Sequence, residues 1–152
     1  MALEEVDTNS LRNAITSCKN AINYSSEKQI LNNISNEKNW KSASCNNLKT
    51  ALTKLIETRY KSLETKLDSY YKIVSYIEDY QKLNQQNEKY ENQRNEIRSK
   101  IANNRYLMTD ENKDEVIRNE MEMAKQSNSL KNNISYNKYQ MKEIKQKIAN
   151  LI

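Results

Sequence analysis

The sequence predicts an all-α protein: an elongated antiparallel helical hairpin or coiled-coil bundle, with about three long helices and a long central helix as its spine. Two observations lead to this fold. The 152 residues include no Gly and no Pro, although the tight turns of β-rich folds depend on such residues. Hydrophobic residues make up 36% and charged residues 30%, a composition that suits long helices with one narrow apolar stripe.

The first predicted helix covers residues 8–35. Asp7 or Thr8 can cap its start, because their side chains can accept a free backbone N–H at a helix end. Apolar residues recur at steps of three and four, the spacing of one helix face, at Leu11, Ile15, Cys18 and Ile22. Residues 24–26 form a weak point, after which Ile30, Leu31 and Ile34 resume the apolar face. The polar segment 35–39 ends the helix.

The second predicted helix covers residues 42–107 and would be about 97 Å long at ~1.5 Å per residue. Its apolar stripe runs through Leu48, Leu52, Leu55, Ile56, Tyr60, Leu63, Leu67, Tyr70, Val74 and Ile77. The phase of this stripe slips between Leu55 and Ile56, a shift that heptad patterns tolerate. Beyond Ile77 the apolar residues become sparser, at Leu83, Tyr90, Ile97 and Ile101.

The third predicted helix begins at Thr109 or Asp110 and shows the cleanest heptad repeat. Steps of four and three join Leu130, Ile134, Asn137, Met141, Ile144, Ile148 and Leu151. Upstream the stripe continues either through Val116, Met123 and Ser127 or through Ile117, Met121 and Ala124. A local break is expected at residues 126–129. Asn137 resembles the polar seam residue that fixes register in coiled coils.

These lengths predict one helical domain over residues 1–152, with a helical hairpin at 8–85 and a coiled-coil extension at 86–152. The first and third helices would fold back on the two halves of the second. Because a two-helix seam buries little area, self-association or a protein partner is expected to complete a four-helix layer.

The composition excludes most catalytic and cofactor chemistry. The chain has no His, so it lacks an imidazole base and a His metal ligand, and without Gly it lacks the loops that cradle phosphates. Cys18 and Cys45 lie several turns apart in this arrangement, beyond the ~7 Å limit for a disulfide, and are expected to be buried or incidental free thiols. We expect no enzyme activity, no cofactor and no metal site.

The charge pattern favours a solvated helix surface. The net charge is +5, but acidic and basic residues alternate without a long block of one sign, which argues against nucleic-acid binding. No apolar run approaches the ~18 residues of a membrane span, so no membrane insertion is expected. The acidic start lacks the apolar region of a signal peptide, which predicts a cytoplasmic protein, or one exported without a cleavable signal.

One local pattern resembles a known family. The single Trp, Trp40, lies in the predicted turn between the first two helices and is followed by small residues at Ser42, Ala43 and Ser44. Over roughly residues 8–85 this arrangement resembles the WXG family of helical-hairpin proteins exported by type VII secretion systems. Trp40, Lys41 and Ser42 match the Trp-x-Gly turn of that family, with Ser in place of Gly.

The rest of the chain extends this resemblance. The family carries a Tyr-x-x-x-Asp/Glu export motif, and the candidates here are Tyr106 with Asp110, Tyr60 with Glu64, and Tyr139 with Glu143. Tyr106 with Asp110 follows a predicted helix end and is the best match. The additional length resembles helical proteins that are encoded beside LXG-domain toxins and act as targeting factors or chaperones.

The resemblance implies a non-enzymatic type VII secretion protein that pairs through amphipathic helices with the helical domain of a toxin, or with a small helical protein. The expected helical interface comprises Leu48, Leu52, Leu55, Leu63, Leu67, Val74, Ile77, Leu130, Ile134, Met141, Ile144 and Ile148. The alternatives are a coiled-coil scaffold or adaptor that self-assembles without a secretion role and a helical nucleic-acid-binding protein.

Overall fold

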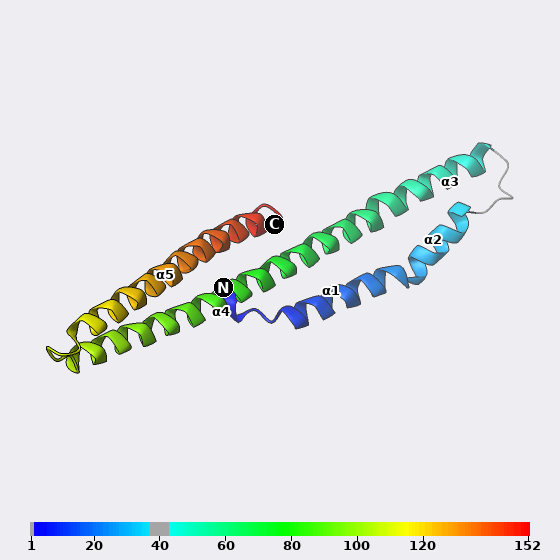
Figure 1. The fold of residues 1–152 in the computed structure, drawn as a ribbon. Helices are drawn as coiled ribbons and strands as arrows, with labels where there is room; N and C mark the ends of the chain where they lie inside the picture. The colour runs from blue at the N-terminus through cyan, green and yellow to red at the C-terminus, as the bar shows by residue number, and fades with distance from the viewer. Residues whose placement is uncertain (1, 37–42) are drawn as a thin grey trace. The chain divides into compact units, whose positions relative to one another are not determined.

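The computed structural model describes residues 2–36 and 43–152, with the side chains of Glu27, Ser35 and Cys45 outside that description. It confirms the all-α class, because the described residues form helices and turns and no strand. The helices are α1 (Thr8–Asn23), α2 (Ser26–Asn36), α3 (Ala43–Ile56), α4 (Ser62–Tyr106) and α5 (Lys113–Ala149) (Figure 1). A 3₁₀ turn at Leu3–Glu5 precedes α1, and a π-helical turn at Glu57–Lys61, called the π turn below, joins α3 to α4.

The chain divides into two compact units. The N-terminal unit comprises Val6–Ser75 with Leu151, and the C-terminal unit comprises Tyr76–Asn150 with Met1–Glu5 and Ile152. Helix α4 therefore contributes its first residues to the N-terminal unit and the remainder to the C-terminal unit.

The first predicted helix is interrupted at the expected weak point. Asp7 caps α1, and its carboxylate accepts the backbone N–H of Ser10 at 3.0 Å. After the end of α1, the hydroxyl of Ser25 donates to the carbonyl of Ile22 and accepts the backbone N–H of Lys28. One serine side chain thus bonds both to the end of α1 and to the start of α2, which explains the break by competition between side chain and helix backbone.

The second predicted helix is an uninterrupted helical run, and the π turn lies at its phase slip. Leu52 and Tyr60 are eight residues apart, whereas Tyr60, Leu67 and Val74 follow at intervals of seven. A π turn accommodates one extra residue within a helix, so these residues stay on one face. The prediction of a slip after Leu55 is thereby given a structural cause.

The core of the N-terminal unit lies between α1 and the run from the π turn into α4. Its buried residues are Ile15, Ile22, Tyr60, Leu67 and Val74, with Leu31 and Ile56 packed against them. Lys19 pairs with Asp68, and Lys28 pairs with Glu64. Because higher numbers in the first segment meet lower numbers in the second, the two segments are antiparallel. Helix α2 also packs on α3.

In the C-terminal unit, α5 runs antiparallel along α4 (Figure 1). The side chain of Arg105 donates to Glu120 at 2.9 Å near one end, and the ammonium of Lys147 lies 5.8 Å from the centre of the Tyr76 ring near the other. The heptad seam of α5 contains the buried residues Ile134, Asn137, Met141, Ile144 and Ile148, and half-buried Val116, Glu120, Met123, Ser127 and Leu130 extend it upstream. Of the two upstream registers, the one through Val116 is therefore correct.

Two details of α5 differ from the prediction. The helix continues through residues 126–129, because packing against α4 outweighs the weak helix propensity of this polar stretch. It also begins at Lys113, with Asn112 as its N-cap rather than Thr109 or Asp110. The side chain of Asn112 accepts the backbone N–H of Thr109 at 2.7 Å, which holds the turn before the helix.

Candidate helix-pairing surfaces

A polar layer crosses the apolar seam of the C-terminal unit. Asn87 on α4 and Asn137 on α5 are each only 7% exposed, and they are the buried polar residues among those described. The amide nitrogen of Asn137 donates to the side-chain oxygen of Asn87 at 3.0 Å, and the amide nitrogen of Asn87 lies 3.5 Å from the sulfur of Met141. A one-heptad slip would separate the two amides in an apolar environment, so the pair fixes the register of the two helices.

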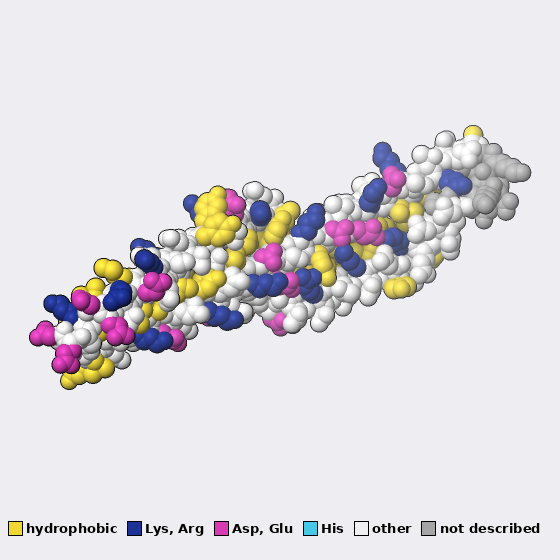
Figure 2. Space-filling model, viewed as in Figure 1, with side chains coloured by type: hydrophobic (Ala, Val, Ile, Leu, Met, Phe, Trp, Pro, Cys, Tyr) yellow, Lys and Arg dark blue, Asp and Glu magenta, His cyan; other side chains and the backbone are white. Residues whose placement is uncertain are grey.

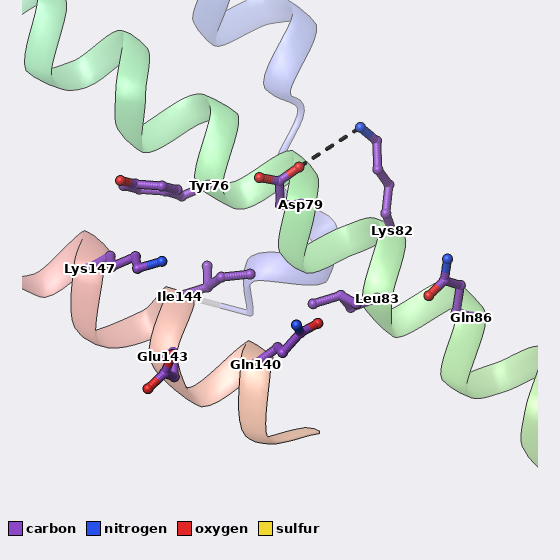
Figure 3. Close-up of a pocket in the computed structure, with 9 residues that line it drawn as sticks. All are labelled: Tyr76, Asp79, Lys82, Leu83, Gln86, Gln140, Glu143, Ile144 and Lys147. Carbon is purple, nitrogen blue, oxygen red and sulfur yellow. Dashed lines mark ion pairs between the residues drawn. The ribbon is translucent and has the colours of Figure 1, made fainter. Parts of the chain in front are cut away.

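A shallow groove of about 400 Å³ lies between α4 and α5 near this layer (Figure 3). Leu83 and Ile144 point toward each other at its floor, while Lys82 and Glu143 point away from it. The rim has mixed charge, and Asp79 and Lys82 form an ion pair at 3.9 Å. This is the outer side of a coiled-coil seam, with polar side chains over an apolar floor.

The start of the chain joins the C-terminal unit at Tyr80. This residue is buried, and its hydroxyl donates to the carboxylate of Glu4 at 2.9 Å. The backbone amide of Glu4 and then the Tyr80 hydroxyl lower the pKa of the Glu4 carboxyl by hydrogen bonding. The ammonium of Lys145 lies 5.0 Å from the centre of the Tyr80 ring, so a cation and a carboxylate both contact the same phenol.

The seam of α1 differs from the predicted stripe. Ile15 and Ile22 are buried as expected, but Leu11 and Cys18 are exposed. The half-buried positions on the packed face are instead Thr8, Arg12 and Lys19. The Cys18 thiol is free and exposed, so of the two expected alternatives, a buried or an incidental free thiol, it is the incidental one.

Two cations explain this difference. The guanidinium of Arg12 and the ammonium of Lys19 lie 4.6 Å and 5.5 Å from the centre of the Tyr71 ring. Long cationic side chains can bury their apolar stems while their charged ends contact an aromatic face. A count of apolar residues misses this packing, because it treats Arg and Lys as solvent-facing.

The predicted interface residues fall into three classes. Leu67, Val74, Ile77, Ile134, Met141, Ile144 and Ile148 are buried within their own units. Leu52 and Leu130 are half-buried. Leu48, Leu55 and Leu63 are 51%, 43% and 43% exposed, and Tyr70 beyond them is 50% exposed. We call these last four residues the exposed apolar row.

The exposed apolar row is continuous along the helical run of the N-terminal unit. Leu48 and Leu55 are one heptad apart, as are Leu63 and Tyr70. The interval from Leu55 to Leu63 is eight residues, and the π turn between them accommodates the extra one. The row therefore keeps a constant position beside the buried residues Tyr60 and Leu67.

The residues that resemble the WXG family motifs lie in different surroundings. Trp40, Lys41 and Ser42 lie outside the described residues. Tyr106 is the last residue of α4 and is 88% exposed, and Asp110 is exposed in the turn before α5. Of the other two matches, Tyr60 is buried, and the Tyr139 hydroxyl donates to Glu143 at 2.9 Å.

The net positive charge belongs to the N-terminal unit. Residues 6–75 contain eleven Lys and Arg against six Asp and Glu, whereas the remaining residues contain fourteen of each. Charges of both signs are nevertheless mixed along the visible surface (Figure 2). This is a diffuse positive potential rather than a single basic patch.

No protein-family model, curated protein or solved structure matches this chain. Within residues 2–36 and 43–152, no cluster of three His, Cys, Asp or Glu side chains is placed to hold a metal ion. None of the helices in the same ranges is both long and apolar enough to cross a bilayer.

Proposed function

We propose that this chain is a non-enzymatic helical protein of a type VII secretion system. Its N-terminal unit pairs through amphipathic helices with the helical domain of a toxin, or with a small helical protein, and it serves that partner as a targeting factor or chaperone. The exposed apolar row carries the proposal, because it places four large side chains at heptad spacing beside a helix pair.

The size of this row fits the edge of a larger bundle. Each side chain keeps roughly half of its surface in water, so covering it with a partner helix contributes on the order of 1 kcal/mol. Four such residues give about 4 kcal/mol before the cost of association. A stable complex therefore needs a partner helix that runs along most of the unit, which is how helices pair in a four-helix layer.

The family resemblance supports the secretion role. The sequence Trp40-Lys41-Ser42 resembles the Trp-x-Gly motif of the WXG family, with Ser in place of Gly. The candidate export motif has its tyrosine at the end of α4 and its acid in the following turn, where Tyr106 is almost fully exposed. A secretion receptor could bind this tyrosine without opening the helix pair behind it.

The test is co-purification of the tagged full chain from its native cells, followed by an export assay. We expect a single partner with a long helical domain, which is lost in the Leu55→Ser/Leu63→Ser variant and weakened by Trp40→Ala. Met121→Ser is the matched control, because Met121 is an exposed apolar residue of the other unit. Asp110→Ala should keep the partner but block its export.

Recovery of the chain alone, or equal recovery of the partner by the Leu55→Ser/Leu63→Ser variant, would contradict the pairing proposal. Unchanged export by Asp110→Ala would remove the Tyr106 motif from it.

A scaffold or adaptor role is the second candidate, and the unbroken heptads of α5 favour it. It requires self-assembly through the residues from Leu130 onward. In the structure, however, Ile134, Met141 and Ile144 of this stripe are already buried in the C-terminal unit. Sedimentation equilibrium distinguishes the two roles, since a scaffold forms oligomers that Leu55→Ser/Leu63→Ser leaves intact.

A further inference from the structure

We propose that one side of the N-terminal unit, formed jointly by α1 and the part of the exposed apolar row from Leu55 to Tyr70, binds an amphipathic helix with acidic residues along its flank. This inference rests on the proposed function and names the surface and the chemistry of the partner. We call this side the apolar edge, and define it by Leu11 and Cys18 on α1 together with Leu55, Leu63 and Tyr70.

The helix geometry places these residues on one side of the unit. Leu11 and Cys18 each lie four residues before a buried isoleucine of α1, and Leu63 lies four residues before the buried Leu67. In an antiparallel helix pair, the positions that lie four residues before a buried seam residue on one helix meet the equivalent positions of the other helix on the same side of the seam. Leu11 and Cys18 of α1 therefore share one surface with Leu63 and Tyr70 of α4, and the exposed apolar row continues this surface to Leu55 on α3.

The opposite side of the same seam is closed by polar contacts. There Lys19 pairs with Asp68, and Arg12 and Lys19 both lie over the ring of Tyr71. The guanidinium of Arg12 also donates to the hydroxyl of Ser75 at 3.4 Å. One side of the helix pair is thus covered by its own side chains, and the apolar edge is the side that remains open.

The apolar edge has room for a helix to approach. Ala14 and Ala21 are exposed on α1 next to Leu11 and Cys18. Small side chains at such positions allow the backbone of a neighbouring helix to come close, while the larger side chains opposite, Leu63 and Tyr70, supply the apolar contact area.

The charge of the unit determines which helix fits. Residues 6–75 carry the whole net charge of +5. Within them, Lys66 is exposed and lies three residues after Leu63 and four residues before Tyr70, so it lies beside both on the helix surface. A second copy of this surface would bring like charges together, which disfavours self-association. A helix with acidic residues flanking its apolar face is complementary both to the edge and to its surroundings.

The probes are two fluorescein-labelled peptides of about four heptads, long enough to be helical. Both have Leu at the seam positions, and the flanking positions are Glu in one and Lys in the other. Anisotropy is measured with the full chain carrying Cys45→Ser, so that Cys18 is the remaining thiol. In the same samples, the rate of alkylation of Cys18 by iodoacetamide reports whether the apolar edge is covered.

We expect the Glu peptide to bind at least about tenfold more tightly than the Lys peptide, and to slow alkylation of Cys18 about tenfold at saturation. Leu63→Ser should weaken binding about tenfold, and Lys66→Glu should reduce the preference for the Glu peptide, because it places an acidic side chain beside Leu63 and Tyr70. Met121→Ser should change neither measurement. Circular dichroism confirms that each variant retains its helix content.

Three outcomes would overturn the proposal: no difference between the peptides, binding that leaves the alkylation rate of Cys18 unchanged, or a dimer that protects Cys18 without any peptide. Failure of the apolar edge and failure of the proposed function give different results. Peptide binding with Cys18 protection, but without a partner in native cells, would refute the proposed function alone. A native partner that leaves Cys18 unprotected would refute the apolar edge alone.

Discussion

The buried Asn layer makes a quantitative prediction about the C-terminal unit. In Asn137→Ala, the side-chain oxygen of Asn87 loses its 3.0 Å hydrogen bond while the residue stays buried. An unsatisfied buried polar group costs about 1–3 kcal/mol. Asn133, exposed on the same helix, is the matched control, because Asn133→Ala gains the same helix propensity of about 0.5 kcal/mol and breaks no buried bond.

The two asparagines should also be coupled. Asn87→Ala leaves the amide of Asn137 without its acceptor, but the double variant leaves no orphaned group in the layer. The double substitution should therefore cost about 1–2 kcal/mol less than the sum of the single substitutions.

The assay is urea unfolding followed by circular dichroism, with hydrogen exchange of the α5 amides to assign the loss to the C-terminal unit. Each variant is measured at several protein concentrations, so that any self-association is detected. Additive costs within about 0.3 kcal/mol, or equal effects of Asn133→Ala and Asn137→Ala, would refute the role of the layer.

Three further predictions concern the π turn, the N-cap of α1 and a side-chain contact on α5. Deleting Thr58 should convert the π turn to regular α-helix and preserve the melting temperature in thermal unfolding. Deleting Thr53 should instead rotate the side chains before residue 53 by about 100° relative to those after it, and should lower the melting temperature. The hydrogen bonds from Ser10 lower the pKa of Asp7. The cap that Asp7 gives α1 should therefore be fully formed above the ordinary carboxyl pKa, and it should be lost as the pH falls through the lowered pKa. Faster hydrogen exchange of the first α1 amides will report this loss. The Glu143 carboxylate raises the pKa of Tyr139. In Glu143→Gln, an NMR titration should find the pKa of Tyr139 nearer its ordinary value, and an unchanged pKa would contradict the contact between the two side chains.

The sequence predicted the fold class and most helix positions because both depend on local periodicity. The break near Tyr24, the slip after Leu55 and the cap at Asp7 were all visible in the pattern. The seam of α1 was not, because its packing uses Arg12 and Lys19. A stripe of apolar residues does not reveal cations whose charged ends lie over the ring of a tyrosine from a distant segment.

The candidate surface was only partly predictable for the same reason. Periodicity placed Leu63 and Leu67 in one stripe, although they face different neighbours. Only the tertiary contacts of α1 show that Leu67 is buried and Leu63 is open. Asn87 was missed because its role depends on the alignment of α4 with Asn137, about fifty residues away along the chain.

The uneven burial along the α4–α5 seam sets an order of opening. The buried residues of α5 are confined to Ile134–Ile148, while the stretch from Val116 to Leu130 is only half-buried. Amides near the turn should therefore exchange through partial unzipping, and those beyond Ile134 only when the whole unit opens. The end of α4 at Tyr106 and the turn that carries Asp110 can thus fray and re-form with little free-energy cost, while the Asn layer keeps the two helices aligned for closing again.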